Sequence, residues 1–497
     1  MIKTIKRKIV NSINPVYLVD SICGSGKSHR LIEYILGLQD SSEAIPQRVL
    51  IAVPTHELAT ETRNKMLDAG IHGYHVKVDS GAVLALKQTL SESFDYPVVI
   101  TTHQALQVFC ERATFDSEMQ KLLYPFKVFI DEIPAVWHGD HATVLHSDSV
   151  TDNFPFMQWM EERDGLLFLK SDNENDLYKY YHERHAGSDS LKAVIYAVLN
   201  GSGLLYGETD KGYSFFAQTA NPVINCAMWS ERLIIMGAGV SRSEWRYVAE
   251  NVAKVECMPA PDHLLPDNDR REHKNTPVKL VSVLKPGVRA TLTQLQEVFN
   301  NHLQTIALTM GSRFIFATNN DKGICNFKTI ALNSLEDNGK GKAVSMASYG
   351  LNVYQSYHAA AFLGCANLNA TDNNRWAQWL NFSGYDAETV LRLKVEAMTY
   401  ERCYQFISRT SIRDSSCKEA LTFIVPDTQC AEYIKRWYLP QAEITTLGIH
   451  KERKKVKGEN TKQAIQELKA KGMKQKAIAE ALGIDLNTVK YHCRKKK

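Results

Sequence analysis

The sequence predicts an α/β protein with two parallel-sheet domains and a small all-α unit at its C-terminal end. The chain has 497 residues, more than one ordinary hydrophobic core accommodates, so we expect two or three domains. Apolar strand candidates alternate with helical patterns in the first half, and the alternation restarts near residue 277. Residues 451–497 carry a net charge of +10, whereas residues 1–450 carry −6. A basic tail on a mildly acidic body favours a polyanionic partner.

Composition is that of an ordinary globular protein. Hydrophobic residues make up 44% and charged residues 23% of the chain, and no apolar stretch approaches the roughly 18 residues of a membrane span. Residues 1–8 are basic but lack the apolar core of a signal peptide. The ten cysteines never form a C-x-x-C pair, which predicts a reduced cytoplasmic protein without a zinc or iron–sulfur site.

The first predicted domain spans residues 1–257. Its strand candidates are residues 16–20, 49–53, 98–102, 128–130 and 233–236. A stretch of about residues 140–230 mixes polar turns, such as 171–175, with helical pieces, such as 191–199, and is interpreted as an insert.

A proline- and charge-rich joint, residues 258–276, precedes the second predicted domain at 277–445. Its strand candidates are residues 278–283, 314–317, 343–346, 358–363 and 421–425. Residues 446–460 are interpreted as a basic linker, and residues 461–497 as the small helical unit.

A glycine-rich turn lies between the first strand candidate and a helical stretch at residues 31–36. It reads Gly24-Ser25-Gly26-Lys27-Ser28, the layout of a phosphate-binding loop. Backbone N–H groups there bind polyphosphate oxygens; Lys27 would reach the β- and γ-phosphates, and the Ser28 hydroxyl would bind Mg²⁺. The competing interpretation is a turn that merely contains lysine.

A second motif, which is acidic, supplies the other groups needed for hydrolysis of a nucleotide. The apolar run 126–130 ends in Asp131-Glu132. Asp131 would hold Mg²⁺ through water, and Glu132 would orient and deprotonate the attacking water. The competing interpretation is an acidic strand end without function.

Two other strand candidates are each followed by a short segment with threonines that can cap a helix. These segments are Pro54-Thr55 and Thr101-Thr102-His103. Because carboxyl ends of parallel strands meet at the edge where ligands bind, we expect them to contact a nucleic-acid backbone. A capped helix without function is the alternative.

In the second half, Gln405, Arg409 and Arg413 recur every four residues. On a helix over residues 401–413 they would share one face and reach a γ-phosphate across a cleft. We leave open which arginine would act as the arginine finger. A solvated helix face is the alternative.

The C-terminal unit has the spacing of a helix-turn-helix. Ala479, Gly483, Ile484 and Val489 suit two small crossing helices. A helix at 462–471 would complete three helices. DNA contacts are expected from Asn487, Thr488, Lys490 and Arg494. The alternative is a basic amphipathic tail.

In order, these motifs resemble those of superfamily 2 helicases, over roughly residues 15–430. The motifs are Gly24–Ser28, 54–59, 101–106, 131–134, 233–241, 348–352 and 405–413. The resemblance implies two RecA-like domains with ATP and Mg²⁺ in their cleft, Gly350 at the nucleotide, and a single strand across both. Ile133-Pro134 departs from the DEAD-box and DEAH-box forms, and 408–413 departs from the usual arginine spacing.

The sequence therefore predicts an ATP-dependent DNA helicase or translocase, with the tail binding duplex DNA. By analogy, a role in phage or mobile-element replication or recombination follows from the resemblance. RNA remains an alternative track. Two other classes stay open: a DNA-packaging motor, and a DNA-binding regulator switched by ATP.

Overall fold

The computed structural model describes the chain over most of its length. The described residues are 14–39, 48–76, 82–92, 98–145, 155–183, 188–210, 212–266, 273, 277–311, 313–321, 326–336, 340–346, 353–414, 416–449, 458–482 and 484–493. The chain forms two compact units, Met1–Gly448 and Ile449–Lys497. Among the described residues, no helix has the length and apolar character needed to span a bilayer.

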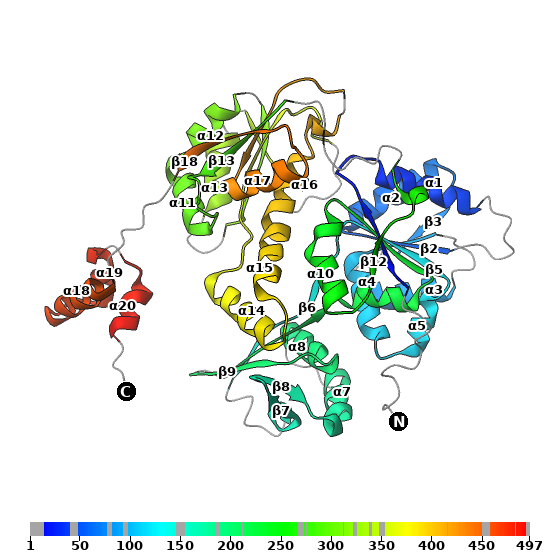
Figure 1. The fold of residues 1–497 in the computed structure, drawn as a ribbon, viewed down its shortest axis with the longest axis horizontal. Coiled ribbons are helices and arrows are strands. Elements are labelled where there is room, and N and C mark those ends of the chain that lie inside the picture. Colours follow the sequence, from blue (N-terminus) through cyan, green and yellow to red (C-terminus); the bar gives the residue numbers. More distant parts are fainter. Residues whose placement is uncertain are drawn as a thin grey trace. The chain divides into compact units, whose positions relative to one another are not determined.

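A seven-stranded parallel sheet in the order β12-β1-β11-β5-β2-β4-β3 organises the first half of the larger unit (Figure 1). Its strands are β1 (Val16–Asp20), β2 (Arg48–Val53), β3 (Gly73–His75), β4 (Val98–Thr102), β5 (Phe126–Asp131), β11 (Arg232–Gly237) and β12 (Cys257–Pro259). All five strands expected here form. The short edge strands β3 and β12 were missed, because three-residue edge strands carry little periodic signal.

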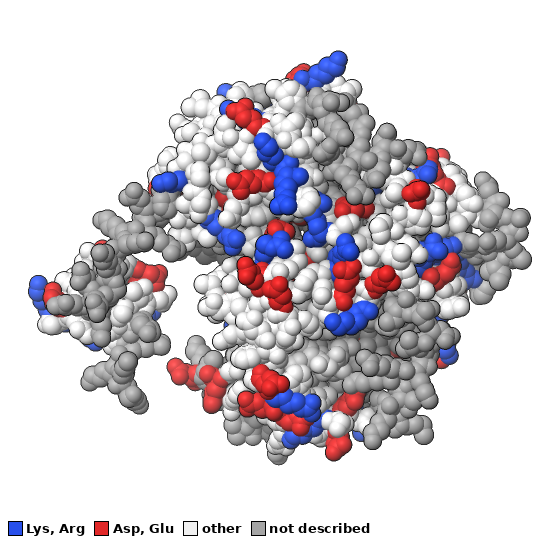
Figure 2. Space-filling model, in the orientation of Figure 1, with Lys and Arg blue, Asp and Glu red and all other residues white. Residues whose placement is uncertain are grey.

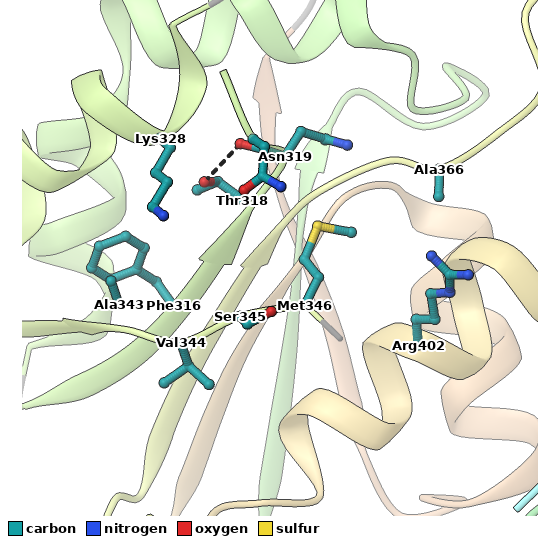
Figure 3. Close-up of a pocket in the computed structure, with 11 residues that line it drawn as sticks. Phe316, Thr318, Asn319, Lys328, Ala343, Val344, Ser345, Met346, Ala366 and Arg402 are labelled. Carbon is teal, nitrogen blue, oxygen red and sulfur yellow. Dashed lines mark hydrogen bonds between the residues drawn. The ribbon is translucent and has the colours of Figure 1, made fainter. Parts of the chain in front are cut away.

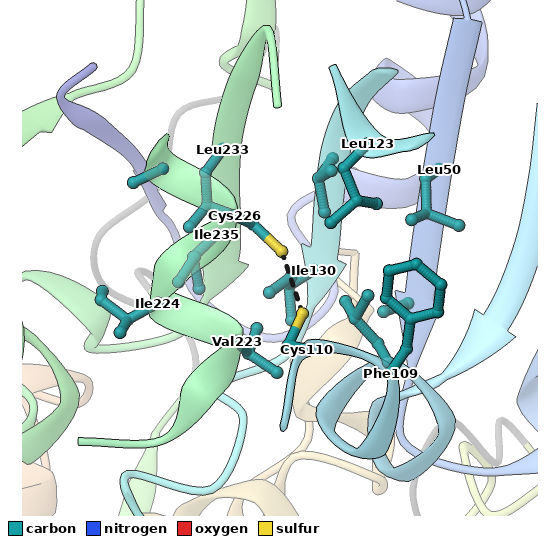
Figure 4. Close-up of a cluster of buried hydrophobic side chains, with 14 of the residues drawn as sticks. Leu50, Phe109, Cys110, Leu123, Ile130, Val223, Ile224, Cys226, Leu233 and Ile235 are labelled. Carbon is teal, nitrogen blue, oxygen red and sulfur yellow. Dashed lines mark hydrogen bonds between the residues drawn. The ribbon is translucent and has the colours of Figure 1, made fainter. Parts of the chain in front are cut away.

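Helices cover both faces of this sheet. They are α1 (Lys27–Gln39), α2 (His56–Asp68), α3 (Ala82–Ser91), α4 (His103–Ala113), α5 (Ser117–Leu123), α9 (Cys226–Trp229) and α10 (Glu244–Asn251). α1 and α2 pack on one face, and the other five pack on the opposite face. The hydrophobic core beneath these five helices contains two thiols in close contact, those of Cys110 and Cys226, whose sulfurs lie 3.5 Å apart (Figure 4). The nine cysteines in the described ranges are all free.

The stretch between β5 and β11 forms a separate lobe, as expected for an insert. Its elements are β6 (Trp137–Leu145), β7 (Met160–Arg163), β8 (Leu166–Leu169), α7 (Glu174–Glu183), α8 (Asp189–Leu199), β9 (Leu205–Thr209) and β10 (Gly212–Ala220). β6, β10 and β9 form an antiparallel sheet. The polar segment 171–175, expected as a turn, instead forms a 3₁₀ turn that leads into α7.

A second sheet in the order β15-β14-β16-β17-β13-β18 organises the other half. Its strands are β13 (Val278–Leu284), β14 (Phe314–Thr318), β15 (Gly341–Ala343), β16 (Ala359–Leu363), β17 (Leu421–Val425) and β18 (Glu443–Ile449). The inner pairings and that of β15 are parallel. The strand expected at 343–346 is wrong, because β15 ends at Ala343. β18 was missed and occupies the start of the expected linker; it lies at the edge, where its residues alternate poorly.

The helices of this half are α11 (Leu292–Asn301), α12 (Leu303–Met310), α13 (Phe327–Ala331), α14 (Ala370–Phe382), α15 (Ala387–Val395), α16 (Arg402–Ile407) and α17 (Thr428–Trp437). A π-helical turn, η8 (Glu396–Glu401), joins α15 to α16. α16 and α17 pack on one face of the sheet. α14 and α15 extend toward the insert (Figure 1). Two predominantly parallel sheets, each covered by helices, thus confirm the expected α/β class for the larger unit.

The smaller unit contains α18 (Gly458–Ala470), α19 (Gln475–Leu482) and α20 (Leu486–Cys493). Its miniature core consists of Ile465, Ile478, Ala479 and Val489. Three short helices around one apolar centre agree with the predicted element types, while the role of the unit remains a prediction.

Candidate functional site: a glycine-rich loop facing the second sheet

The glycine-rich loop joins β1 to α1 and lies at the carboxyl edge of the first sheet. Gly24 and Gly26 have φ angles of 81° and 95°, which L side chains rarely adopt. A Cβ on Gly24 would lie 3.1 Å from Arg413 Cγ, so the loop packs against the second half of the chain. Lys27 Nζ donates hydrogen bonds to the carbonyls of Ser21 and Ile22, at 2.9 and 2.8 Å.

One cavity of about 350 Å³ gathers most of the residues expected at a nucleotide. Its lining includes Gly24, Ser25, Gly26, Lys27, Ser28, Asp131, Glu132, Gln355, Gln405 and Arg413. The Ser25 hydroxyl has no hydrogen-bond partner among the described residues, although it is buried. A buried donor of this kind at the cavity wall suits a phosphate oxygen.

The acidic pair lies at the end of β5, against the neighbouring strand β11. Glu132 has a φ angle of 68°, an uncommon conformation for a non-glycine residue, and its N–H donates to Met236 O at 2.7 Å. Burial and then the Asp131 charge raise the pKa of Glu132 to about 7, while Lys27, Arg409 and Arg413 oppose the shift. Burial also raises the pKa of Asp131. A carboxyl with a pKa near neutrality suits a general base.

The expected helix over residues 401–413 is wrong. α16 ends at Ile407, and a turn leads to a short 3₁₀ segment, η9 (Ser411–Arg413). The two arginines therefore do not share a helix face with Gln405. Arg409 is only 3% exposed and donates to Ser345 O at 3.3 Å, whereas Arg413 lines the cavity.

The motifs expected to contact nucleic acid lie along a larger cavity of about 660 Å³. Pro54, His103 and Gln104 line it together with Glu132 and Gln405. Thr55 and Thr102 cap α2 and α4 by accepting from Leu58 N and Ala105 N, each at 3.2 Å.

Thr101 and Thr102 are buried, so their hydroxyls do not face this cavity. The two threonines lead into the N-terminal end of α4. Backbone N–H groups at that helix end are available to an anion.

A partly buried network of charged side chains behind the glycine-rich loop was missed by sequence reasoning. Asp20 accepts from the N–H groups of Gly239 and Ser241, at 2.8 and 3.2 Å. Arg242 lies 4.0 Å from Asp20 and 3.6 Å from Glu401, so it links the two halves of the larger unit.

Gly239 is required within this network. Its φ angle is 71°, and a Cβ would lie 2.7 Å from Glu401 Oε1. The only sequence signal was the pair of glycines at the end of β11, Gly237 and Gly239. The partners of Asp20 come from residues 219 or more positions away, which no local pattern reveals.

A further cavity of about 390 Å³ lies at the carboxyl edge of the second sheet (Figure 3). Its polar side chains, which were not singled out from the sequence, come from Thr318, Asn319, Asn320, Lys328, Ser345 and Arg402. Asn319 is held by bonds between its side chain and the backbone of Cys365, at 2.8 and 2.9 Å. Amide, hydroxyl and cationic groups around one hollow fit a phosphodiester.

In the C-terminal unit, Asn487 and Lys490 are exposed on α20, and Thr488 is partly exposed. Asp485 caps α20 by accepting from Asn487 N at 2.7 Å. Arg494 lies outside the described residues, as do Gly483, Gly350 and the rest of the motif at 348–352.

Within the described ranges, no group of three His, Cys, Asp or Glu side chains could hold a metal by itself. Ser28 and Asp131 nevertheless line the same cavity. A hydroxyl and a carboxylate fit Mg²⁺ carried by nucleotide phosphates, because that ion commonly takes only one or two protein ligands.

Comparison with known proteins identifies remote structural neighbours, helicases among them. Xpd4 of S. tokodaii is 12% identical, with 88% of this chain and 96% of Xpd4 covered and a TM-score of 0.46. XPD in its apo form gives 13% identity, 88% and 97% coverage and a TM-score of 0.47. S. cerevisiae Dbp5 bound to RNA and ADP BeF3 is 12% identical, with 88% of this chain and 86% of Dbp5 covered and a TM-score of 0.37.

No protein-family model matches the sequence, and no curated protein matches it. TM-scores below 0.5 at such low identity do not define a family. The residues of the site therefore have to carry the functional conclusion.

Proposed function

We propose that this chain is a nucleic-acid-dependent ATPase of the superfamily 2 helicase type, which moves along or separates DNA strands. The observation that carries the proposal is the 350 Å³ cavity. The phosphate loop and Asp131-Glu132 line it from the first sheet, and Gln405 and Arg413 line it from the second half. A site divided between two sheets couples hydrolysis to their relative movement.

The first half supplies the hydrolytic groups. Gly24, Gly26 and the start of α1 would surround the phosphates, and Lys27 would exchange its carbonyl partners for the β- and γ-phosphates. Ser28 and Asp131 would hold Mg²⁺, which neutralises charge that develops during phosphoryl transfer. Glu132 would take a proton from the attacking water.

The second half would supply the charge that stabilises the transition state. Arg413 is the better candidate for an arginine finger, because it lines the cavity and its stem packs over Gly24. Arg409 is buried under the site and bonded to Ser345 O, which suits a supporting role. Gln405 lines both cavities and suits the orientation of water.

Nucleic acid would run along the carboxyl edges of both sheets. Pro54, His103 and Gln104 lie on the first edge, and Asn319 and Lys328 lie on the second. On the face shown in Figure 2, Lys and Arg atoms run from helices α16 and α17 toward α10 and α15, with acidic atoms beside them. Backbone contacts of this kind do not distinguish DNA from RNA.

DNA is favoured by the C-terminal unit. We propose that Asn487, Thr488 and Lys490 of α20, together with Arg494 further along the chain, contact duplex DNA as a helix-turn-helix does. A part in phage or mobile-element replication or recombination is the setting we propose, by analogy with the resemblance of the motifs.

ATP hydrolysis measured with no nucleic acid, single-stranded DNA, duplex DNA and RNA tests this function. We expect stimulation by single-stranded DNA, with turnover lost in Glu132→Gln. Equal turnover under all four conditions would contradict the helicase proposal and favour the packaging-motor or switch classes.

A further inference from the structure

We propose that His103 is a positioning residue that couples nucleic acid at the edge of β4 to the catalytic Glu132. It would do so by holding the peptide bond between Asp131 and Glu132. This inference rests on the proposed ATPase function. It differs from a simple nucleic-acid contact, the role expected for His103 from its motif.

The peptide between Asp131 and Glu132 is held at both of its polar atoms. Its carbonyl, Asp131 O, lies 2.9 Å from His103 Nε2 and accepts a hydrogen bond from the tautomer that carries the proton on Nε2. Its N–H donates to Met236 O at 2.7 Å. β5 is therefore tied at its end to β11 on one side and to the start of α4 on the other.

This peptide needs such support. Glu132 has a φ angle of 68°, and a non-glycine residue in this conformation stores strain that the surroundings must hold. A rotation of the peptide plane would relieve the strain and reorient the Glu132 carboxyl. Since that rotation breaks both hydrogen bonds, loss of the His103 bond makes it easier.

The position of His103 connects it to the nucleic-acid edge. It is the first residue of α4, directly after Thr102, whose side chain caps the helix. His103 and Gln104 line the 660 Å³ cavity, and so does Glu132. A strand that binds the N-terminal end of α4 would therefore shift or fix the imidazole that holds the Asp131 carbonyl. The imidazole needs no positive charge for this, and burial lowers the pKa of His103 to about 4.

His103→Leu and His103→Gln test the inference, because only the second keeps an N–H donor of suitable length. With single-stranded DNA at saturation, we expect kcat to fall about tenfold in His103→Leu, with KM for ATP within twofold of wild type. His103→Gln should recover most of the kcat. Unchanged kcat with weakened DNA binding in His103→Leu would overturn the inference and leave His103 as a contact only.

A second measurement does not depend on turnover. Amide hydrogen exchange across residues 126–136 of the full chain should be faster in His103→Leu than in wild type, and restored in His103→Gln. Gln104→Ala is the matched control and should leave this exchange at the wild-type rate, because Gln104 lines the same cavity and, among the described residues, the side chain seen bonded to Asp131 O is that of His103. Exchange in His103→Leu equal to that of wild type would overturn the inference. Altered exchange in a protein without ATPase activity would instead refute the proposed function alone.

Discussion

Arg409 and Arg413 illustrate how two similar residues acquire different roles. Arg413 faces the phosphate loop, while Arg409 lies among buried groups and contacts Ser345 O. The four-residue spacing predicted the same position on a helix face for both arginines. Only the turn after Ile407 separates them, since it directs one side chain to the cavity and the other to the interior.

We expect Arg413→Ala to lower kcat for ATP by about 10³-fold, the effect of losing an arginine finger, with little change in thermal stability. Arg409→Ala should lower the melting temperature instead, because it empties a buried position and removes the bond to Ser345 O. Steady-state kinetics and thermal unfolding of both variants check this. A larger kcat loss in Arg409→Ala than in Arg413→Ala would reverse the assignment.

His103 should make stability depend on pH. Its pKa is lowered to about 4 in the folded chain, against about 6.5 when unfolded. Below pH 6.5 the unfolded chain binds a proton that the folded chain does not, so the free energy of unfolding falls as the pH falls. Between pH 7 and pH 5 the loss is up to about 2 kcal/mol.

Urea unfolding of wild type and His103→Gln at both pH values, with chelator present, measures this loss as the difference between the two proteins. Equal pH dependence in wild type and variant would show that His103 does not titrate with a lowered pKa.

At the scale of elements, the segment 401–413 shows why periodicity can mislead. Residues 406–412 are all nearly buried, between the second sheet and the phosphate loop. An amphipathic surface helix was therefore the wrong template, and the Thr410 hydroxyl instead donates to Ile407 O at 2.7 Å within the turn. Burial on every side came from tertiary packing that a local pattern does not contain.

A buried ion pair joins α15 to α10 of the first half, and Trp137 of the insert bonds to the same carboxylate. Lys394 Nζ lies 3.0 Å from Glu244 Oε1, and both side chains are at most 10% exposed. Trp137 Nε1 donates to the same oxygen at 2.6 Å, and Lys394 lies 3.7 Å from the Trp376 ring centroid. Burial lowers the pKa of Lys394, although Glu244 partly opposes this.

Lys394→Met should lower the free energy of unfolding by about 3 kcal/mol, because it leaves Glu244 buried without its cation. Lys394→Met combined with Glu244→Gln should regain most of that loss. Denaturant unfolding of both single variants and the double variant forms a cycle. Additive effects would show that the pair does not interact energetically.

At the scale of the whole molecule, the C-terminal unit has its own core and forms a separate compact body. Ending the chain at residue 457 should therefore leave ATP hydrolysis with single-stranded DNA within about twofold of the full chain. Affinity for duplex DNA should fall at least about tenfold, with a shallower salt dependence, because the basic residues are lost. Loss of hydrolysis in the shortened chain would show that the unit belongs to the motor.

By itself, the sequence determined the two-sheet α/β class, the glycine-rich turn before α1, the Asp131-Glu132 strand end and the presence of a long segment between β5 and β11 that lies outside the first sheet. Each depends on residues close in sequence, where alternation of apolar and polar side chains, glycine conformation and helix capping act locally. The same local rules explain why the edge strands β3, β12 and β18, which lack a clear alternation, escaped notice.

Only the tertiary structure decided which arginine faces the loop, that Asp20, Arg242 and Glu401 form one network, and that His103 holds the Asp131 carbonyl. These contacts join residues that lie 28 to more than 200 positions apart. Their geometry is set by strand order and by the packing of one sheet against the other. The residue pattern of a single segment predicts neither the strand order nor this packing.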